Sequence, residues 1–483
     1  HERYIEGFRA DERIFDQLYK YQVVLIDGKR TIGKQDAFRA FMERNAQLLS
    51  PDGVTGVVVP SAFHANEGAT GVRRLYLEEM NLRCCYSFEN RNKLFEIDSR
   101  FKFAVIVASR QGPTKEFRCA FYLHDDAWLF GDRQENSLGY DLDFVRRTGG
   151  NYLGLLELRS LSDFAVAQTC FLDGQLFGEV CENLGIRLGR ELNMTDDAWR
   201  FTLTSSVLVS SDDPRVFETV SRLQENGFLI LHEGKTFWHY DDLWESRPTY
   251  LVSDQQIQDR PDWLRSAQYF KMAYRSIASS TNERTITFHI LPPGAVFGNS
   301  APVERIPWKV PRSSVLPLIA TTNTFVFDWT ARVRTGANIN QFILFSCPLP
   351  PIKTISGFLR STALRLACNH MGYAPLWHEQ LGDAWREPTP PFTWPVIAGD
   401  DARWAVRAAI DCVVAQAYGL NREQYAHVLS TFSHSSYRKA PELCLARFDE
   451  LAEIGLEAFT KQWDPYWDIP LNENLPLPVI ELV

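Results

Sequence analysis

Leu48-Leu-Ser-Pro-Asp-Gly-Val-Thr-Gly-Val-Val-Val-Pro-Ser-Ala-Phe63 is the stretch of sequence that decides the fold class. Its Pro-Asp-Gly segment at 51–53 is a turn signal, because these residues favour the backbone angles and local hydrogen bonds of turns. The run Val54–Val59 that follows is rich in β-branched side chains and is bounded by glycine and proline. A short apolar run bounded in this way predicts a buried β-strand.

Helix and strand patterns alternate around this strand. Residues 36–49 predict an amphipathic helix, with a stripe formed by Phe38, Phe41, Met42, Asn45, Leu48 and Leu49. Residues 69–81 predict a second helix, and Arg83–Ser87 and Phe103–Ala108 predict two strands. Since only one loop separates these strands, we expect them to pair antiparallel at an edge of the sheet. Alternation of this kind is typical of an open α/β sheet.

The middle of the chain has a different sequence pattern. Residues 110–200 mix a strand-like segment, Phe117–Leu123, with helical pieces. Residues 200–350 are rich in aromatic residues, proline and short β runs, which predicts a mixed α+β domain. These runs are Phe237–Tyr240, Thr285–Ile290 and Phe342–Phe345.

The last part of the chain is predicted to be helical at 353–370 and 401–463, with a proline-rich linker at Pro388–Pro395 between them. We therefore expect four regions. They are an α/β domain at 1–125, a connector at 126–200, an α+β domain at 201–352 and a helical region at 353–483.

Composition excludes several classes of protein. The 483 residues carry 51 Lys and Arg against 60 Asp and Glu, for a formal net charge of −9, and 45% of them are hydrophobic. This is typical of a globular chain and excludes intrinsic disorder, collagen and a small disulfide scaffold. A negative total argues at first against nucleic-acid binding, because phosphate contacts need Lys and Arg.

The cysteines and the apolar runs indicate the cellular compartment in which the protein is expected. Nine cysteines are scattered without a CxxC pair, so we expect reduced core cysteines rather than a zinc or redox site. No apolar run approaches the ~18 residues of a membrane helix, and no signal peptide is visible. We therefore expect a cytoplasmic protein without membrane association. The chain opens at His1 without methionine and soon resembles the middle of a domain, so we expect further sequence upstream.

Generic catalytic motifs are absent from the sequence. It contains no GxxxxGK[ST], GxSxG, HExxH or GxGxxG pattern. The ten histidines show no metal-ligand spacing, so no metal site is expected. Pro51-Asp52 and Pro261-Asp262 lack the trailing partners of a nuclease site. These motifs alone indicate only an α/β protein.

Five blocks of sequence nevertheless form a recognisable order. Two lie early, two lie in the α+β region and one lies near the C-terminus. They are Leu48–Phe63; Ser87–Val107; Tyr274–Thr285 with Leu291–Pro293; Thr322–Arg334 with Asn338–Phe342 and Cys347–Pro350; and Arg407–Leu420 with Tyr425–Phe432.

In this order the blocks resemble N6-adenine DNA methyltransferases of type IIG restriction–modification systems and of the BREX and DISARM phage-defence systems. The early blocks are similar to the end of the catalytic domain, the next two to the target-recognition region and the last to the C-terminal helices. The resemblance implies the back half of a Rossmann-like methyltransferase sheet, then a mixed α+β target-recognition domain and C-terminal helices. It also implies S-adenosylmethionine as cofactor and double-stranded DNA as partner, and it leaves room for other defence-system subunits.

Two family motifs are not found in the chain. The glycine-rich S-adenosylmethionine motif and the (N/D/S)PP(Y/F/W) catalytic motif both precede the matching blocks in the family, and neither occurs here. Thr389-Pro-Pro-Phe392 mimics the second, but it lies in a linker after the recognition region. The resemblance therefore implies that both motifs lie upstream, and that residues 1–483 alone are inactive.

The block Ser87–Val107 contains the candidate base-binding residue. The resemblance places Phe95 where the family has an aromatic side chain that stacks on the flipped adenine. A core aromatic is the alternative, and Phe88 is the nearest competitor. Around Phe95, four cations are candidates for phosphate contacts or, alternatively, for a solvated strand face. They are Arg91, Lys93, Arg100 and Lys102.

In the recognition region, several residues are of the types that bind base edges. Arginine pairs with guanine and asparagine with adenine in the major groove. The candidates are Arg275, Asn282, Arg284, Arg332, Arg334, Asn338 and Asn340. Residues 281–284 could equally form a turn with a helix cap and a local ion pair, and Asn338 and Asn340 could only fix a loop. Asp411 is expected to be a packing residue.

The charge total conceals local differences. Residues 85–110 carry five cations against three carboxylates (+2), and residues 271–340 carry eight against three (+5), so the remainder is −16. Since DNA binding needs only a local basic face, the acidic total does not exclude it. The favoured hypothesis is a site-specific DNA adenine-N6 methyltransferase of a restriction–modification or phage-defence system. The alternatives are a non-catalytic DNA-recognition or scaffold subunit, and an unrelated α/β enzyme.

Overall fold

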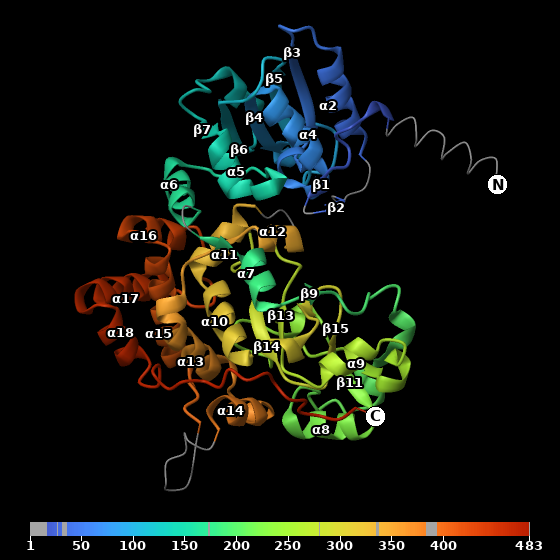
Figure 1. The fold of residues 1–483 in the computed structure, drawn as a ribbon, viewed down its shortest axis with the longest axis vertical. Helices are drawn as coiled ribbons and strands as arrows, with labels where there is room; N and C mark the ends of the chain where they lie inside the picture. Colours follow the sequence, from blue (N-terminus) through green and yellow to red (C-terminus); the bar gives the residue numbers. More distant parts are fainter. Residues whose placement is uncertain are drawn as a thin grey trace, which may run out of the picture. The chain divides into compact units, whose positions relative to one another are not determined.

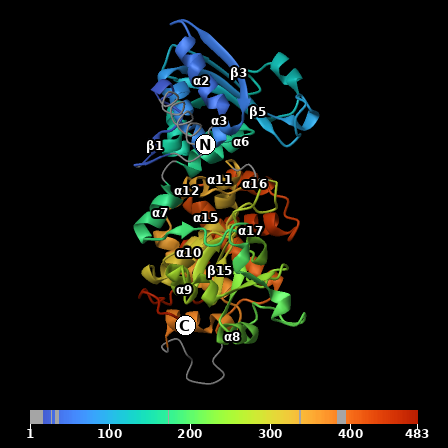
Figure 2. The same ribbon diagram turned by 90° about the vertical axis from the view of Figure 1, so that its right-hand side faces the viewer.

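The structure of the chain is a computed structural model, which describes residues 17–26, 28–30, 36–171, 174–279, 281–334, 338–382 and 394–482. The chain divides into two compact units, His1–Leu172 and Asp173–Val483. Figures 1 and 2 show the elements of both units. In the described ranges, no helix combines the length and the apolar character needed to cross a membrane. The segment Thr389–Phe392 lies outside the described residues.

A five-stranded sheet in the order β3-β5-β4-β6-β7 forms the centre of the first unit. β5 runs antiparallel to both β3 and β4, whereas β4 and β6 are parallel. β3 and β4 therefore run in the same direction, and the chain between them crosses over β5. The strands are β3 (Val54–Pro60), β4 (Asn81–Glu89), β5 (Lys102–Ser109), β6 (Glu116–Leu123) and β7 (Leu138–Asp141).

Short helical elements join these strands, and Figure 1 shows α2 and α4 beside the sheet. Asp36 begins α2 as its N-cap, because its side chain accepts a hydrogen bond from the Phe38 amide. The elements are β1 (Leu25–Ile26), β2 (Lys29–Arg30), α2 (Ala37–Leu48), α3 (Ala62–Ala65), η1 (Glu67–Ala69), α4 (Thr70–Arg74), η2 (Leu75–Glu79), η3 (Asn90–Asn92), η4 (Asp126–Phe130), α5 (Leu142–Gly149), η5 (Gly150–Tyr152) and α6 (Leu161–Cys170).

The structure confirms the predicted strands but corrects their positions. The strand at Val54 is only half-buried: it lies at the edge of the described sheet, and Val54 and Val58 are 49% and 55% exposed while Thr55 and Val59 are buried. Conversely, the predicted antiparallel pair β4–β5 forms, but inside the sheet rather than at its edge. An apolar run shows that a strand is favoured, but its place in the sheet depends on which strands pair with it.

The first helix is also corrected in detail. It forms where predicted, yet its buried residues include Arg39 and Glu43, while Phe41 and Leu48 are 68% and 67% exposed. Glu43 is buried because its carboxylate accepts hydrogen bonds from the Tyr21 amide and the Gln22 side chain. The predicted stripe of this helix is therefore only partly correct: Met42 is buried as expected, but polar anchors to an upstream segment bury Arg39 and Glu43 while Phe41 and Leu48 stay exposed.

The second unit contains two four-stranded sheets, β10-β12-β11-β15 and β14-β13-β16-β9, and the two-stranded sheet β17-β8. Apolar side chains from both larger sheets share a core cluster that includes Ile230, Leu251, Leu291 and Phe297. The strands are β8 (Gln175–Leu176), β9 (Leu188–Gly189), β10 (Phe201–Leu203), β11 (Phe228–His232), β12 (Tyr250–Ser253), β13 (Lys271–Tyr274), β14 (Phe288–Leu291), β15 (Ala295–Phe297), β16 (Val303–Glu304) and β17 (Pro348–Leu349).

Helices make up most of the rest of this unit, with α10 packed against α13 and α15 against α17. They are α7 (Phe177–Leu184), α8 (Phe217–Glu225), α9 (Pro261–Ala267), α10 (Arg312–Thr322), α11 (Phe325–Arg332), α12 (Gln341–Phe345), α13 (Ser356–Ala367), α14 (Ala374–Leu381), α15 (Asp400–Ala417), α16 (Arg422–Ser430), α17 (Ala440–Ile454) and α18 (Leu456–Trp463). Single 3-10 turns are η6 (Ala198–Arg200), η7 (Thr204–Ser206), η8 (Gly234–Thr236), η9 (Asp254–Ile257), η10 (Pro307–Lys309), η11 (Lys353–Ile355) and η12 (Met371–Tyr373).

The predictions for this unit have mixed outcomes. The helices predicted at 353–370 and 401–463 are present as α13 and as α15 to α18. The run Phe342–Phe345 is helical rather than extended, and Phe237–Tyr240 forms a turn rather than a strand. Runs of four residues are too short for periodicity to separate helix from strand.

The division into units differs from the predicted regions. β7 pairs with β6, so the first sheet extends past residue 125, where the first domain was expected to end. The compact units divide at Leu172–Asp173, inside the predicted connector, and the helical C-terminal region belongs to the same unit as the α+β region. The nine cysteines are all free and buried, as expected.

Candidate nucleic-acid interface

The loop 90–101 between β4 and β5 is built around the buried side chain of Asn90. Its amide nitrogen donates to the carbonyl oxygens of Phe95 and Ile97, at 2.9 and 3.1 Å. Its amide oxygen accepts a hydrogen bond from the Phe95 backbone, at 3.0 Å. One side chain therefore fixes the backbone on both sides of Phe95.

The Phe95 ring is 44% exposed and packs edge-on against Phe103, with the ring centroids 4.8 Å apart. Phe88 stacks on the same Phe103 ring at 5.4 Å, but it is only 1% exposed. Of the two candidates, Phe88 is therefore a core residue, and Phe95 is the one whose ring can meet a ligand. Whether Phe95 stacks on a base stays a prediction.

Carboxylates lie beside three of the four loop cations. Arg91 pairs with Glu89 at 2.6 Å, and Arg100 pairs with Asp98 at 2.7 Å. Lys102 lies 2.9 Å from Glu157 and 3.6 Å from Glu89. Lys93 is exposed, and it forms no ion pair with any residue that the structure describes. The net charge of +2 counted over residues 85–110 therefore overstates the positive potential of this loop. It omits Glu157, which lies outside that stretch of sequence but pairs with Lys102.

Glu157 is the buried anchor under this loop. Its carboxylate receives Lys102 on one oxygen and lies 3.1 Å from His64 on the other. Burial by itself would raise the pKa of Glu157, but His64 and Lys102 lower the pKa to about 2. Lys102 therefore holds the start of β5 to the segment at 157, and the phosphate contact expected of it stays a prediction.

In the second unit, Arg284 and Arg332 are buried within the protein. Arg284 pairs with the fully buried Asp328 at 2.8 Å and donates to the Asn323 carbonyl at 2.7 Å. Arg332 donates to the carbonyl oxygens of Asn282 and Thr431, at 2.6 and 3.0 Å. Both guanidinium groups are thus engaged in the core, and the structure leaves neither of them available to a base edge.

The other recognition candidates lie nearer the surface. Arg275 and Arg334 are partly exposed, and Asn282, Asn338 and Asn340 are exposed. Asn282 closes a turn through a 3.1 Å hydrogen bond from its backbone amide to Ser279, and Asn340 is the N-cap residue of α12. This turn ends at Asn282, and Arg284 pairs with the distant Asp328 rather than locally, so the alternative predicted for 281–284 is present only in part. Contacts of these side chains with DNA stay predictions.

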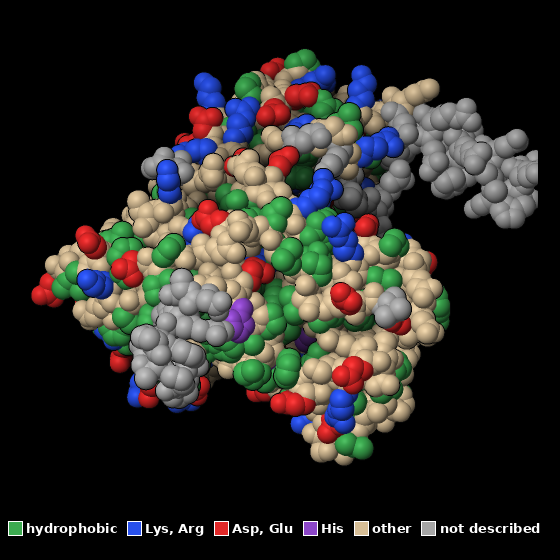
Figure 3. All heavy atoms as spheres, turned by 60° about the horizontal axis from the view of Figure 1, so that its bottom comes forward, with side chains coloured by type: hydrophobic (Ala, Val, Ile, Leu, Met, Phe, Trp, Pro, Cys, Tyr) green, Lys and Arg blue, Asp and Glu red, His purple; other side chains and the backbone are tan. Residues whose placement is uncertain are grey.

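The +5 balance of residues 271–340 does not form a basic face. Lys271 and Arg312 are fully buried, with Glu191 3.6 Å from Lys271 and Glu304 2.7 Å from Arg312. Arg284 and Arg332 are buried as well. For the chain as a whole, the face drawn in Figure 3 shows Lys and Arg side chains interspersed with Asp and Glu side chains. Local charge counted along the sequence is therefore a poor guide to surface charge, since ion pairs form across long sequence separations.

Asp411 makes a contact between two helices that sequence patterns do not reveal. It is buried, and its carboxylate accepts a 2.6 Å hydrogen bond from the Phe325 amide at the start of α11. Burial raises the pKa of Asp411 to about 6, although Arg284, the Phe325 amide and Arg407 act in the opposite direction. Asp411 therefore caps a neighbouring helix, in agreement with the packing role expected for it.

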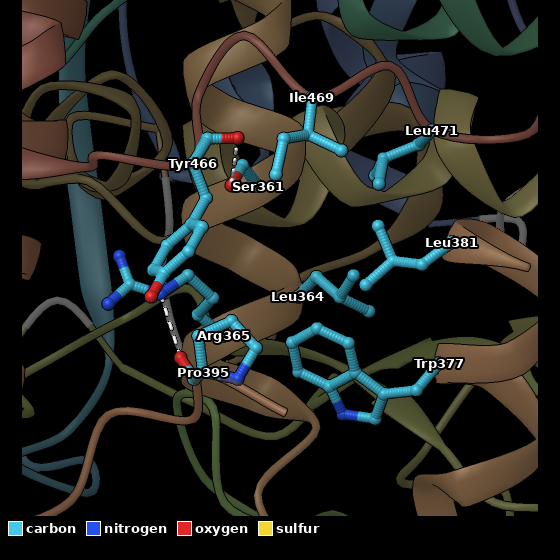
Figure 4. Close-up of a pocket in the computed structure, with 9 residues that line it drawn as sticks. All are labelled: Ser361, Leu364, Arg365, Trp377, Leu381, Pro395, Tyr466, Ile469 and Leu471. Atoms are coloured by element: carbon cyan, nitrogen blue, oxygen red, sulfur yellow. Dashed lines mark hydrogen bonds between the residues drawn. The ribbon is translucent and has the colours of Figure 1, made fainter. Parts of the chain in front are cut away.

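Figure 4 shows a pocket in the second unit between α13, α14 and the segment at 466–471. It is lined mainly by apolar side chains, including Leu364, Trp377 and Ile469, and its volume is about 10 Å³. A space of this size holds at most a single water molecule, so this pocket cannot accept a nucleotide-sized cofactor.

The described residues do not supply a cofactor site that we can assign. No group of three or more His, Cys, Asp or Glu side chains among them could hold a metal ion. The glycine-rich donor motif is absent from the sequence, so the residues that are present do not form a recognisable cradle for S-adenosylmethionine.

Comparisons with known proteins give structural likenesses of low strength. No protein-family model matches the chain, and no curated protein matches it. Solved structures similar to the chain include the type IIL restriction–modification enzyme MmeI in complex with DNA (TM-score 0.40, 11% identity, 82% of this chain and 53% of that chain). They also include the DrdV–DNA complex (0.38, 12%, 75% and 42%) and the type ISP restriction–modification enzyme LlaBIII bound to DNA (0.39, 11%, 75% and 28%).

The chain therefore spans about half or less of the length of these three proteins. TM-scores below 0.5 and identities near 11% are too low to transfer a fold or an activity to this chain.

Proposed function

We propose that the chain is part of a site-specific DNA adenine-N6 methyltransferase of a restriction–modification or phage-defence system. The observation that carries the proposal is the half-exposed Phe95, which Asn90 holds on the loop after β4. This is the position at which the resembling family has its base-stacking aromatic. An enzyme that modifies a base must take it out of the stack, and a rigid exposed ring can hold it.

The topology of the first unit supports a Rossmann-like assignment. β3 and β4 are parallel and are joined by a helical crossover, which is the βαβ unit of such sheets. β3 is also an edge strand in the described part of the chain, with Val54 and Val58 exposed. Exposed apolar edges favour pairing with a further strand, as expected if an upstream half completes the sheet.

A methyl-transfer assay tests this proposal. We expect the full-length protein to transfer a radioactive methyl group from S-adenosylmethionine to unmodified DNA that contains its site. Phe95→Ala should lower the rate about tenfold or more, because stacking on a base contributes roughly 1–3 kcal/mol. Phe101→Ala is the matched control, since Phe101 lies in the same loop and is 61% exposed.

The outcome separates the methyltransferase from the non-catalytic recognition subunit, which are two of the three hypotheses that the sequence leaves open. Absence of transfer by the full-length protein on such DNA would contradict the methyltransferase proposal. If that protein still bound DNA, the non-catalytic recognition subunit would be favoured instead. Equal losses in Phe95→Ala and Phe101→Ala would remove the specific role of Phe95 and leave only a role for the loop.

A further inference from the structure

Arg275 lies directly after β13, and the backbone around it is fixed in place. Its amide donates to the Thr287 carbonyl at 3.1 Å, and the Ser276 amide donates to the Ser300 carbonyl at 3.0 Å. The Arg275 guanidinium carbon lies 4.8 Å from the centre of the Trp238 ring. The side chain is partly buried, so the indole and its surroundings remove part of its hydration.

The cation of Arg275 has no carboxylate partner among the described residues, in contrast to that of Arg260. Arg260 also lies over a tryptophan, Trp263, but pairs with Asp259 at 3.5 Å. Through its guanidinium, Arg275 forms no hydrogen bond or ion pair with the residues that the structure describes, and burial lowers its pKa. A partly desolvated cation without a partner is unfavourable, and a ligand that supplies acceptor atoms would stabilise it.

Trp238 belongs to a second planar pair. Its ring stacks on that of Trp244, with centroids 5.3 Å apart and an interplanar angle of 18°. Both indoles are partly exposed. Arg275, Trp238 and Trp244 therefore place three flat groups together at the surface of the second unit, although they come from segments separated in the sequence.

The loop that carries both tryptophans is held from inside by Arg215. This buried guanidinium donates to the carbonyl oxygens of Thr236 and Trp244, at 2.9 and 2.6 Å, and it also contacts that of Asp242 at 3.2 Å. Asp213 neutralises Arg215 at 2.9 Å. Arg215 is thus neutralised by Asp213 and hydrogen-bonded to the loop, whereas the Arg275 guanidinium has no such partner among the described residues.

Further contacts make the same loop rigid. Tyr240 is buried and adopts a φ of +58°, which is costly for a bulky residue and is tolerated where the surroundings hold it. His239 lies 2.7 Å from the Ile286 carbonyl, and the Trp238 amide donates to Asp241 at 2.7 Å. A rigid platform loses little conformational entropy on binding, so it suits a recognition surface.

We propose that Arg275 and the Trp238–Trp244 stack form a DNA-contact site, in which Trp238 holds the guanidinium in the plane needed for two parallel hydrogen bonds. The inference rests on the proposed DNA-binding function and adds the residues of one contact. The planar fork of arginine matches paired acceptors, which DNA offers as phosphate oxygens and as O6 and N7 of guanine. Arg275 is the DNA-contact residue, and Trp238 is its positioning residue.

Binding of the chain to duplex DNA at several salt concentrations tests the site. The probes are a mixed-sequence duplex and an alternating A·T duplex, which contains phosphates but no guanine. We expect Arg275→Ala to weaken binding about tenfold. If the partner is a phosphate, the variant binds both duplexes more weakly, and the slope of log K against log salt concentration falls by about one released counterion. If the partner is guanine, only the mixed duplex loses affinity.

Arg260→Ala is the matched control, because it removes an arginine that lies over a tryptophan but has its own carboxylate. Trp238→Leu should weaken binding in the same way as Arg275→Ala, Trp238→Phe should restore most of it, and the double variant should lose no more than either single variant. A thermal melt of each variant verifies folding.

Equal binding by wild type and Arg275→Ala on both duplexes would overturn the site while leaving the proposed function intact. Failure of the wild-type chain to bind either duplex would overturn both.

Discussion

Two buried carboxylates, one in each unit, have opposite electrostatic situations. Glu157 in the first unit contacts Lys102 and His64 directly, and its pKa is lowered to about 2. Asp411 in the second unit receives one backbone amide, and burial raises its pKa to about 6. The nearby Arg284 is already paired with Asp328. The difference teaches that the ionised form of a buried carboxylate is stabilised by a cation in direct contact with it. A nearby cation that already forms an ion pair with another carboxylate stabilises it less.

Removing the partner of Arg284 should have the largest effect. Asp328→Ala leaves a buried guanidinium and the Thr285 amide without their carboxylate, so we expect a loss of about 3–5 kcal/mol in the free energy of unfolding. Urea denaturation followed by circular dichroism measures it. A loss below about 1 kcal/mol would mean that Arg284 finds another acceptor, such as Asp411, and that the pairing is not exclusive.

Glu157→Gln tests the stabilised carboxylate. Because the pKa of Glu157 is lowered on folding, its contribution is full above the unfolded-state pKa near 4.5 and is lost as pH falls toward 2. We expect the variant to be less stable than wild type by about 3 kcal/mol near pH 6, and the gap to narrow between pH 5 and 3. Hydrogen exchange in β4 and β5 peptides measures this within the first unit. A gap that does not change with pH would contradict the assigned ion pair.

Asp411→Asn should give the opposite pH dependence of stability, and the change in the free energy of unfolding should be slightly smaller than that for Glu157→Gln. The raised pKa of Asp411 means that stability is greatest below the unfolded-state pKa near 3.8 and decreases as pH rises through about 6. Relative to wild type, the variant should therefore gain about 2–3 kcal/mol between pH 4 and pH 7. Hydrogen exchange in α11 and α15 peptides follows it. The amide oxygen of asparagine can still cap α11, so a loss of stability at pH 7 would show that Asp411 is needed as an anion.

The smallest effect is expected at an exposed pair. Asp98 and Arg100 lie in the loop 90–101, where solvent screens their 2.7 Å contact. Asp98→Asn should leave the unfolding midpoint in urea unchanged within error. A clear decrease would show that the loop carries more of the stability of the first unit than its exposure indicates.

Arginine positions show where prediction from the sequence reaches its limit. Residue type made Arg275, Arg284 and Arg332 equivalent candidates for DNA, but only Arg275 keeps its charge at the surface without a partner among the described residues. Asp328 and Thr431, which engage the other two, lie at sequence distances that no local pattern covers. The sequence shows Trp238 only as part of an aromatic run, whereas its stacking on Trp244 and the Arg215 contacts to the loop backbone appear only in the structure.

The sequence by itself determined the elements that depend on neighbouring residues: the turn and strand at 51–60, the pairing of β4 with β5 and the C-terminal helices. Local sterics and periodicity act within a few residues, so they can be recognised along the chain. Only the tertiary structure decided that β3 lies at an edge, that Phe95 is exposed while Phe88 is not, and which cations are neutralised. Burial and charge pairing join residues far apart in sequence, because desolvated groups must find partners wherever the fold places them.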